Sequence, residues 1–248
     1  MSRQECIFGI HAVQALLNSA PQRVVELKVM CGRQDQRMTA VLEAASKANI
    51  KIQQLDRKKL DELCDGNHQG VIAVAKPAPS LTENELYPLL ESLQEEPLVL
   101  VLDGVTDPHN LGACLRSANA AGAHVVLVPK DNSASLTEAA RKVASGAADI
   151  VPLIAVTNLS RTLKKLQDLG LWVAGAAGEA EQTLYELDLT GPRVIVMGAE
   201  GTGMRRLTRE TCDELVKIPM HGTVSSLNVS VATGVLLFEV QRQRLNKR

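Results

Sequence analysis

A glycine-rich segment that contains one carboxylate, Glu200, is the part of this sequence best suited to chemistry. Residues 198–203 read Gly-Ala-Glu-Gly-Thr-Gly and directly follow an apolar run at residues 194–197. Glycine has no Cβ, so such a loop can bring backbone N–H groups close to a ligand. The segment matches neither the dinucleotide fingerprint GxGxxG nor a nucleotide P-loop. A tight turn alone would explain the glycines, but Glu200 adds an acceptor for hydroxyl or amino groups of a ligand.

Two further polar clusters also stand at the ends of apolar runs. Asn110 and Arg116 follow one run, and Ser226 and Asn228 follow another. In an open α/β sheet, the loops at the carboxyl ends of the strands converge on one crevice, where ligands bind. The sequence therefore predicts one composite site made from three loops. Taken singly, the asparagines and the serine would be explained as helix caps, and Arg116 as a surface residue of a helix.

The composition limits the kinds of function that are open. The net charge is −1, so bulk electrostatics give no sign of a nucleic-acid-binding protein, and aromatic residues are 2 %, too few for a base-stacking platform. Each local cluster of basic residues, taken alone, is best explained as a solvated helix face. RNA binding would require several of them to share one surface. These clusters lie at residues 57–59, 161–165, 205–209 and 242–248.

Cysteine and histidine usage predicts a reduced, cytoplasmic protein without a metal site. The five cysteines are far apart, odd in number and form no CxxC pair. His68 and His109 have no partner at metal-ligand spacing and are expected to be hydrogen-bonding loop residues. No apolar run approaches the roughly 20 residues of a membrane span. The polar residues 1–5 do not resemble a signal peptide.

The first 76 residues alternate helical and strand patterns, which predicts a small α/β domain. Pro77 and Pro79 then interrupt the pattern, because two prolines within three residues favour extended backbone. We therefore predict a domain at residues 1–76, a linker at 77–96 and a second domain at 97–248. In the first domain, helices are expected at residues 10–17, 38–48 and 57–64, and strands at 24–30, 50–55 and 70–75.

The second domain is predicted to contain a parallel β-sheet. Its apolar runs do not alternate with polar residues, which suits strands buried on both faces. Hydrophobic residues make up 45 % of the chain, ample for such a core. Strands are expected at residues 98–103, 125–128, 151–156, 171–174, 194–197 and 215–219, and helices at 159–169 and 229–242.

The three clusters, taken together and in this order, resemble the three motifs of the SpoU-type RNA 2′-O-ribose methyltransferases of the SPOUT superfamily. The first motif includes Asn110 and Arg116, the second is the glycine-rich segment, and the third runs from Ile218 to the residues after Asn228. Residues 8–13 and 67–71 resemble the substrate-binding domain of this family. The resemblance covers the whole chain.

This resemblance implies a fold, a cofactor and a substrate. It implies a parallel-sheet domain with a deep trefoil knot, preceded by a small domain like ribosomal protein L30. It also implies that the protein methylates a guanosine 2′-hydroxyl in the peptidyl-tRNA loop of 23S rRNA, uses S-adenosylmethionine, and forms a homodimer through its C-terminal domain. Carried over residue by residue, it makes Gly198, Ile218 and Leu227 cofactor-contacting positions, and Asn110, Arg116, Glu200, Ser226 and Asn228 catalytic or structural positions of the site.

Several alternatives remain open at the level of sequence. A tRNA substrate is the main one, and a non-catalytic RNA-binding or ribosome-assembly protein of the same fold is another. A dinucleotide-dependent oxidoreductase is disfavoured because the early strands lack GxGxxG. The role of Arg116 is also open. The resemblance suggests a general base, but a guanidinium stays protonated below a pKa of about 12, so phosphate binding is physically easier.

Overall fold

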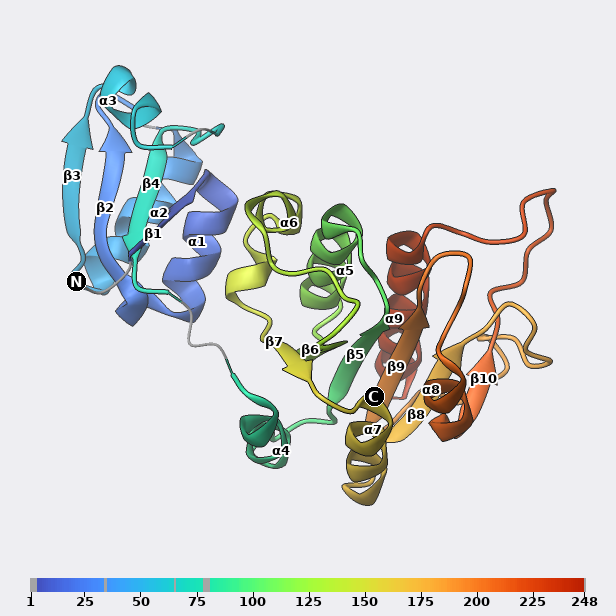
Figure 1. Ribbon diagram of the computed structural model, residues 1–248. Coiled ribbons are helices and arrows are strands. Elements are labelled where there is room, and N and C mark those ends of the chain that lie inside the picture. The colour runs from blue at the N-terminus through green and yellow to red at the C-terminus, as the bar shows by residue number, and fades with distance from the viewer. Residues whose placement is uncertain (1–3, 34, 65, 78–80, 248) are drawn as a thin grey trace. The chain divides into compact units, whose positions relative to one another are not determined.

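The computed structural model describes residues 4–33, 35–64, 66–77 and 81–247 (Figure 1). The chain forms two compact units, Met1–Pro79 and Ser80–Arg248. Both units are mixtures of helices and strands, as the sequence predicts. Residues 78–80 of the predicted linker and Arg248 of the last basic cluster lie outside the described residues.

The first unit is a four-stranded sheet with two main helices. The sheet has the order β1-β4-β2-β3, in which β4 is antiparallel to β1 and β2, and β2 is parallel to β3. Helices α1 and α2 supply buried residues such as Val13, Leu16 and Val41 to its core. Strand β1 was not predicted, because its four residues carry no clear pattern. The elements are β1 (Glu5–Phe8), α1 (Ile10–Ser19), the 3-10 turn Pro21–Arg23, β2 (Val24–Met30), α2 (Gln36–Lys47), β3 (Lys51–Leu55), α3 (Arg57–Asp61) and β4 (Val71–Ala75).

The second unit contains a six-stranded sheet of order β10-β8-β9-β5-β6-β7, and every neighbouring pair of strands is parallel. This confirms the predicted parallel sheet. Its elements are α4 (Glu83–Glu91), β5 (Leu98–Asp103), α5 (Pro108–Ala120), β6 (Val125–Pro129), α6 (Glu138–Ala144), the 3-10 turn Ala147–Asp149, β7 (Leu153–Val156), α7 (Leu159–Asp168), β8 (Trp172–Ala176), β9 (Arg193–Gly198), α8 (Arg206–Thr211), β10 (Glu214–Val216) and α9 (Val229–Asn246).

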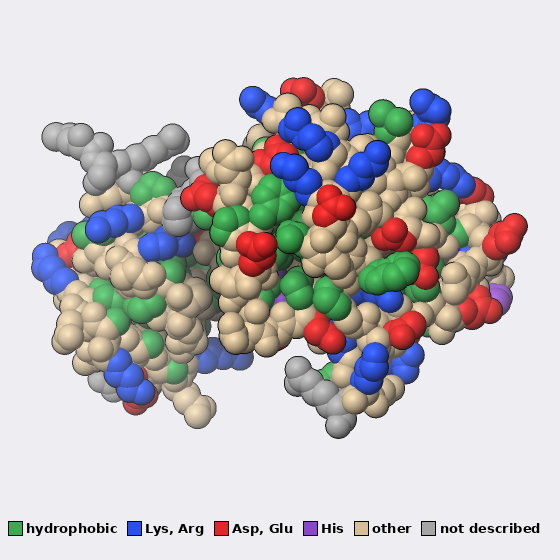
Figure 2. Space-filling model, turned by 90° about the horizontal axis from the view of Figure 1, so that it is seen from below, with side chains coloured by type: hydrophobic (Ala, Val, Ile, Leu, Met, Phe, Trp, Pro, Cys, Tyr) green, Lys and Arg blue, Asp and Glu red, His purple; other side chains and the backbone are tan. Residues whose placement is uncertain are grey.

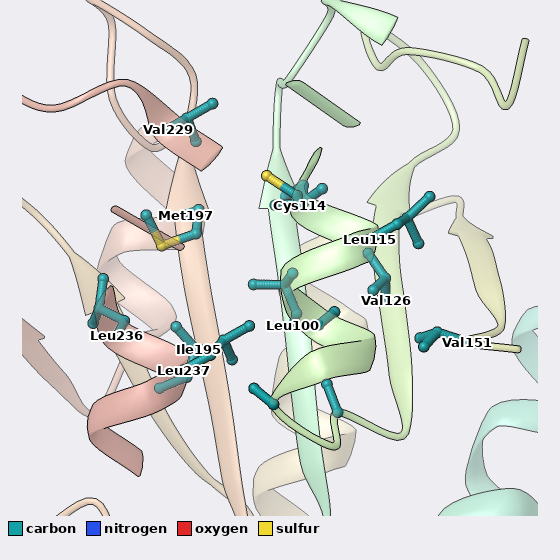
Figure 3. Packing of buried hydrophobic residues seen from close by; sticks show 14 of the residues in the cluster. Leu100, Cys114, Leu115, Val126, Val151, Ile195, Met197, Val229, Leu236 and Leu237 are labelled. Atoms are coloured by element: carbon teal, nitrogen blue, oxygen red, sulfur yellow. The ribbon is translucent and has the colours of Figure 1, made fainter. Parts of the chain in front are cut away.

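The central strands bury both of their faces, which explains their unbroken apolar runs. In β5, Leu98, Leu100 and Leu102 point to the cluster covered by α5, α6 and α9, whereas Val99 and Val101 point to the cluster covered by α4 and α7. Figure 3 shows part of the first cluster, in which Leu100 and Ile195 of the sheet lie between α5 and α9. Helices on both faces leave the carboxyl edge of the sheet as the place for a site.

Helix α4 lies inside the stretch predicted to be a linker. Its Leu86 and Leu90 are buried in the core of the second unit. A capping box between Thr82 and Glu85 fixes its start. The prolines before it and the acidic residues around it hid this helix from the sequence analysis. Residues 83–91 therefore belong to the packed structure of the second unit.

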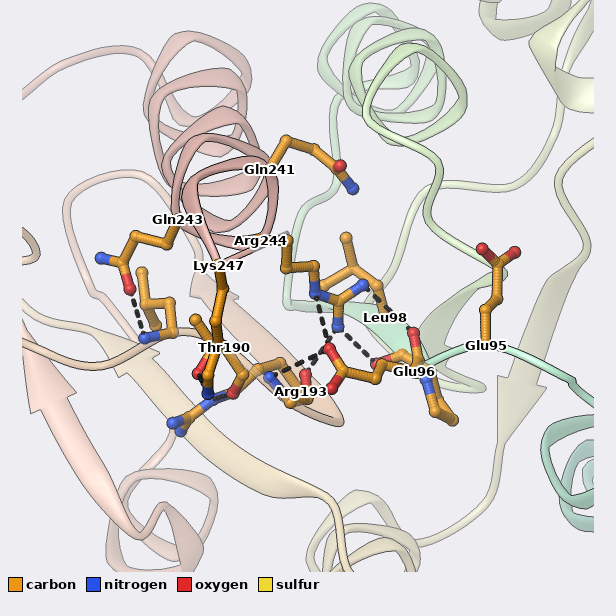
Figure 4. Close-up of polar contacts among 12 residues, drawn as sticks. Glu95, Glu96, Leu98, Thr190, Arg193, Gln241, Gln243, Arg244 and Lys247 are labelled. Carbon is orange, nitrogen blue, oxygen red and sulfur yellow. Dashed lines mark hydrogen bonds and ion pairs between the residues drawn. The ribbon is translucent and has the colours of Figure 1, made fainter.

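The end of α9 is attached to two distant parts of its unit (Figure 4). The guanidinium of Arg244 donates to the carbonyl oxygens of Glu96, Pro97 and Gly191. Gln243 donates to the carbonyl of Leu187 and accepts a bond from the backbone N–H of Leu189. The last turns of α9 thus bind both the segment that precedes β5 and the segment that precedes β9.

Candidate active site

A hydrogen-bond network joins the three predicted loops at the carboxyl edge of the sheet. Oε1 of Glu200 accepts bonds from Asn110 Nδ2 at 3.3 Å, from Asn228 Nδ2 at 2.7 Å and from the backbone N–H of Val229 at 3.3 Å. Asn228 Nδ2 also donates to Asn110 Oδ1 at 3.0 Å. Oε2 of Glu200 accepts no bond from the described residues. One carboxylate oxygen therefore holds the loops together, and the other stays available.

Asn228 both caps a helix and belongs to this network. It is the N-cap of α9, and its Oδ1 accepts from the backbone N–H and the hydroxyl of Ser230 at 2.9 and 2.6 Å. Asn228 is thus a helix cap, as the simpler explanation held, but the amide nitrogen of Asn228 also donates to Glu200. For Asn110 the capping explanation is wrong. Asp107 is the N-cap of α5, so the amide of Asn110 faces Glu200 instead.

The glycine-rich loop folds back tightly on itself. Ala199 and Gly203 exchange backbone hydrogen bonds at 3.1 and 2.9 Å. A Cβ on Gly198 would lie 2.3 Å from the backbone of Gly203, so only glycine fits there. Gly201 and Gly203 have φ values of 80° and 70°, a region that favours glycine. The glycines therefore shape a closed turn that places Glu200 at its tip.

A cavity of about 640 Å³ opens beside this loop. All three predicted cofactor positions, Gly198, Ile218 and Leu227, line it. Ile218 reaches the cavity because β10 ends at Val216, earlier than predicted, and the chain leaves the sheet there. Met197 and Val229 add apolar surface, while backbone groups of the loop add polar surface. A volume in this range suits a nucleoside-sized ligand with one apolar ring.

Arg116 and Ser226 are not part of the network. Ser226 lines the cavity but is exposed, and no hydrogen bond joins it to the other predicted residues, all of which the structure describes. Arg116 is exposed on α5 and has no polar partner among the described residues. It lies six residues after Asn110, which on a helix turns it well away from the face that Asn110 presents to Glu200. Within one chain, the structure thus separates Arg116 from the network.

An ion pair between a buried carboxylate and an exposed arginine lies at the same edge and was missed by the sequence analysis. Asp103, the last residue of β5, has a side chain with 0 % exposure. Its carboxylate accepts from the backbone N–H of Arg205 at 2.9 Å and from Nε of Arg205 at 2.6 Å. Asp103 lies in register with Gly198 of β9. A charge that ends an otherwise apolar run was the available sequence signal.

The buried thiol of Cys114 near the network is neutral, and the described residues form no metal centre. Burial raises the pKa of the Cys114 thiol to about 11, so this cysteine is a packed core residue. No group of three or more His, Cys, Asp or Glu side chains among the described residues could hold a metal ion. Nε2 of His68 donates to Oδ1 of Asp61 at 2.8 Å, and its Nδ1 accepts from the backbone N–H of Gly70, as expected for a hydrogen-bonding residue. No helix in the described part of the chain is long and apolar enough to cross a bilayer.

Comparison with known proteins places the chain in a class of RNA-modifying enzymes. Residues 97–238 match the SpoU rRNA Methylase family, and residues 6–81 match the RNA 2′-O ribose methyltransferase substrate binding family. The chain therefore belongs to the SpoU rRNA methylase family, as its motifs indicated. It is 59 % identical over 248 residues to the 23S rRNA (guanosine-2′-O-)-methyltransferase RlmB of Pseudomonas putida, with 100 % of both chains covered. It is 58 % identical over 241 residues to the enzyme of that name from Escherichia coli, which covers 97 % of this chain and 99 % of the relative.

Solved structures agree with this classification. A crystal structure described as an RNA 2′-O ribose methyltransferase superposes with a TM-score of 0.74 at 28 % identity, and the match covers 98 % of this chain and 90 % of that one. The SpoU methyltransferase AviRb from Streptomyces viridochromogenes, solved in complex with AdoMet, has a TM-score of 0.74 at 22 % identity, covering 98 % and 91 %. At that identity the second likeness shows a shared fold.

Proposed function

We propose that this protein transfers a methyl group from S-adenosylmethionine to the ribose 2′-hydroxyl of a guanosine in 23S rRNA. Family membership and the relatives that match its full length give the reaction and the substrate. The structural observation that carries the proposal is the network in which Glu200 joins Asn110 and Asn228 beside the cavity. A cytoplasmic location follows from this substrate.

The cavity fits the proposed cofactor. Ile218, Leu227 and Met197 provide apolar surface for an adenine ring, and the turn at Gly198 brings backbone groups to the same wall. When bound, S-adenosylmethionine supplies an electrophilic methyl group on a sulfonium whose leaving group is neutral. The protein must therefore act mainly on the nucleophile. We place Ser226, which lines the cavity, among the residues that contact the cofactor.

The chain's own task is to position the ribose and remove a proton from its hydroxyl. A ribose 2′-hydroxyl ionises only at very high pH, so in-line placement and proton removal limit the reaction. Oε2 of Glu200 can accept a hydrogen bond from that hydroxyl, because no described residue donates to Oε2 and the three donors of the network all bind Oε1. Asn110 and Asn228 hold the carboxylate in a fixed orientation. Glu200 thus orients the hydroxyl and takes up its proton.

Arg116 is proposed to act on the site of a second subunit. It is exposed on α5 and turned away from Glu200 of its own chain. Helix α9 beside it exposes an apolar stripe: Val231, Phe238 and Leu245 recur every two helical turns and are 52 %, 52 % and 65 % exposed. Leu236 of the same helix is buried in the core and does not belong to this stripe. We infer a homodimer that covers this stripe and brings each Arg116 to the partner's site, where it binds a phosphate of the target nucleotide.

The first unit is proposed to select the RNA. It matches the substrate-binding family, and it exposes Arg57, Lys58 and Lys59 on α3 and the polar side chains of Asn67 and Gln69. From the family resemblance, we also propose that the second unit is knotted and that the first resembles ribosomal protein L30. We further propose that residues 1–76, 77–96 and 97–248 are the functional divisions of the chain. The residues just before β5, including those of α4, then serve the catalytic unit as packing.

Mapping of ribose methylation tests the function directly. Cells that lack the protein should have 23S rRNA missing one guanosine 2′-O-methyl group, and the intact gene should restore it. A Glu200→Gln gene should express a folded protein without restoring it. Loss of a methyl group from tRNA instead would favour the tRNA alternative. An unchanged methylation pattern in both RNAs would favour a non-catalytic, RNA-binding role.

A further inference from the structure

The guanidinium of Arg205 is oriented by its own chain but keeps unpaired donors among the described residues. Its Nε donates to Asp103, and its backbone N–H donates to the same carboxylate. Its terminal nitrogens have no hydrogen-bond partner among the described residues, and its side chain is 51 % exposed. A buried carboxylate is costly unless it is paired, so Asp103 holds the guanidinium firmly. The outer edge of this guanidinium therefore faces solvent in a fixed orientation.

The neighbouring arginines differ in this respect. Arg206 donates through a terminal nitrogen to Glu210 at 3.2 Å, and Arg209 forms an ion pair with Glu179. Both are thus engaged at the edge with which an arginine binds a phosphate or carboxylate in a bidentate manner. Arg205 presents that edge to solvent, with its position set by the strand that ends at Asp103.

Arg205 also lies at the base of the loop that carries Glu200. Only Met204 separates it from Gly203, the residue that closes the turn with Ala199. Asp103 lies in register with Gly198, so the ion pair and the turn share the carboxyl edge of the sheet. Arg205 is not among the residues that line the cavity beside Glu200. Its free edge is therefore suited to a ligand other than the cofactor.

We propose that Arg205 binds a phosphodiester group of the substrate RNA and that Asp103 positions it to do so. This inference rests on the proposed function, since it assigns one contact of the same substrate. Figure 2 shows Lys and Arg side chains interspersed with Asp and Glu on the face that it draws. With a net charge of −1, this protein has little overall attraction for RNA. Individually oriented cations must then supply much of the phosphate binding.

The test compares RNA affinity and cofactor affinity in matched variants of the full chain. The probe is an in vitro transcribed fragment of 23S rRNA that the wild-type enzyme methylates, with affinity measured by filter binding over a series of salt concentrations. Arg205→Gln should weaken RNA binding about tenfold and lower the salt slope by about 0.7 to 0.9, the value for one lost phosphate contact. Affinity for S-adenosylmethionine, measured by calorimetry, should not change.

Three further variants make the result specific. Arg206→Gln removes the same charge from the next residue and should change RNA affinity little. Arg205→Lys keeps the charge but loses the planar guanidinium and its Nε bond to Asp103, and it should keep the salt slope while binding RNA more weakly. The double variant Asp103→Asn, Arg205→Gln leaves the net charge unchanged and leaves no unpaired buried carboxylate. It should reproduce the loss seen with Arg205→Gln even if the single variant folds poorly.

Each other outcome overturns part of the proposal. Equal losses in Arg206→Gln and Arg205→Gln would mean that only diffuse charge matters. If Arg205→Lys bound RNA as tightly as the wild type, the proposal that Asp103 positions the guanidinium would be wrong. If the folded double variant lost affinity for both the cofactor and RNA, Asp103 and Arg205 would only stabilise the loop at residues 198–203 and would not bind RNA. A wild-type protein that binds neither S-adenosylmethionine nor RNA would instead refute the proposed function.

Discussion

At the level of the residue, the two oxygens of Glu200 are expected to have separate tasks. In Glu200→Gln, the amide oxygen can still accept from Asn110 and Asn228, but the second position becomes an NH₂ that cannot take a proton. We expect methyl transfer to fall about a hundredfold or more, the usual effect of losing an acid–base group. Single-turnover assays at saturating cofactor would measure this loss.

The matched control for that variant is Glu210→Gln. Glu210 is an exposed carboxylate on α8 that pairs with Arg206 and lies outside the network. Its loss should leave the single-turnover rate within about twofold, as for most surface changes. A normal rate in Glu200→Gln would mean that another group accepts the proton.

Which of these residues the sequence can reveal depends on what lies next to them along the chain. Asn110, Glu200 and Asn228 each follow an apolar run, so the geometry of parallel sheets brought them together in the prediction. Asp103 and Arg205 are 102 residues apart, and although Asp103 ends an apolar run, nothing in the sequence pairs it with Arg205. Their pairing depends on the register of β5 with β9, which the sequence does not show. The two tasks of Asn228 likewise became visible only in three dimensions.

At the level of the element, the contact between α5 and α6 depends on Gly112. A Cβ there would lie 2.4 Å from the carbonyl oxygen of Ala140 and 2.9 Å from Cβ of Val143. Gly112→Ala must therefore push α6 away, and we expect it to lower the free energy of unfolding by about 1–3 kcal/mol, as overpacking does. Urea unfolding would measure this change. Gly222→Ala is the control, because a Cβ at Gly222 would meet no atom within 4 Å; an equal loss there would contradict the packing argument.

The long buried strands were predictable from sequence, whereas short or polar elements were not. Apart from Asp103 and Arg193 at their ends, β5, β6 and β9 are apolar because helices cover both faces of the sheet, and few other structures produce runs of this length and composition. Helix α4 contains Pro88 and acidic residues, and only Leu86 and Leu90 reveal its buried side. The strand predicted at residues 215–219 is too long, because β10 ends at Val216 and the chain leaves the sheet there.

At the level of the whole molecule, we expect the first unit to contribute RNA selection but not cofactor binding. A truncated protein should begin at residue 80, because α4 belongs to the core of the second unit. This protein should bind S-adenosylmethionine as the full chain does, since every residue that lines the cavity is retained. Methylation of 23S rRNA should fall by more than about tenfold through lost RNA contacts. A normal rate on the same nucleotide would place selection in the second unit.

The proposed dimer makes a sharp prediction for mixtures of inactive variants. If Arg116 serves the partner's site, a dimer of one Arg116→Ala chain and one Glu200→Gln chain has one fully intact site. Random exchange of equal amounts should therefore restore about one quarter of the wild-type rate. Each variant alone should stay inactive. No recovery, after native mass spectrometry has shown that mixed dimers form, would assign Arg116 to its own chain.

The attachment of the last helix also bears on how the protein is made. Arg244 binds the carbonyl groups of Glu96, Pro97 and Gly191, so the last turns of α9 hold together segments that are translated earlier. A domain generally folds as a unit as it emerges during synthesis. Here the unit that carries the site cannot complete its contacts until α9 has left the exit tunnel. If the proposed function is correct, a new copy of the protein cannot modify ribosomes until α9 has been translated and has packed against the segments that precede β5 and β9.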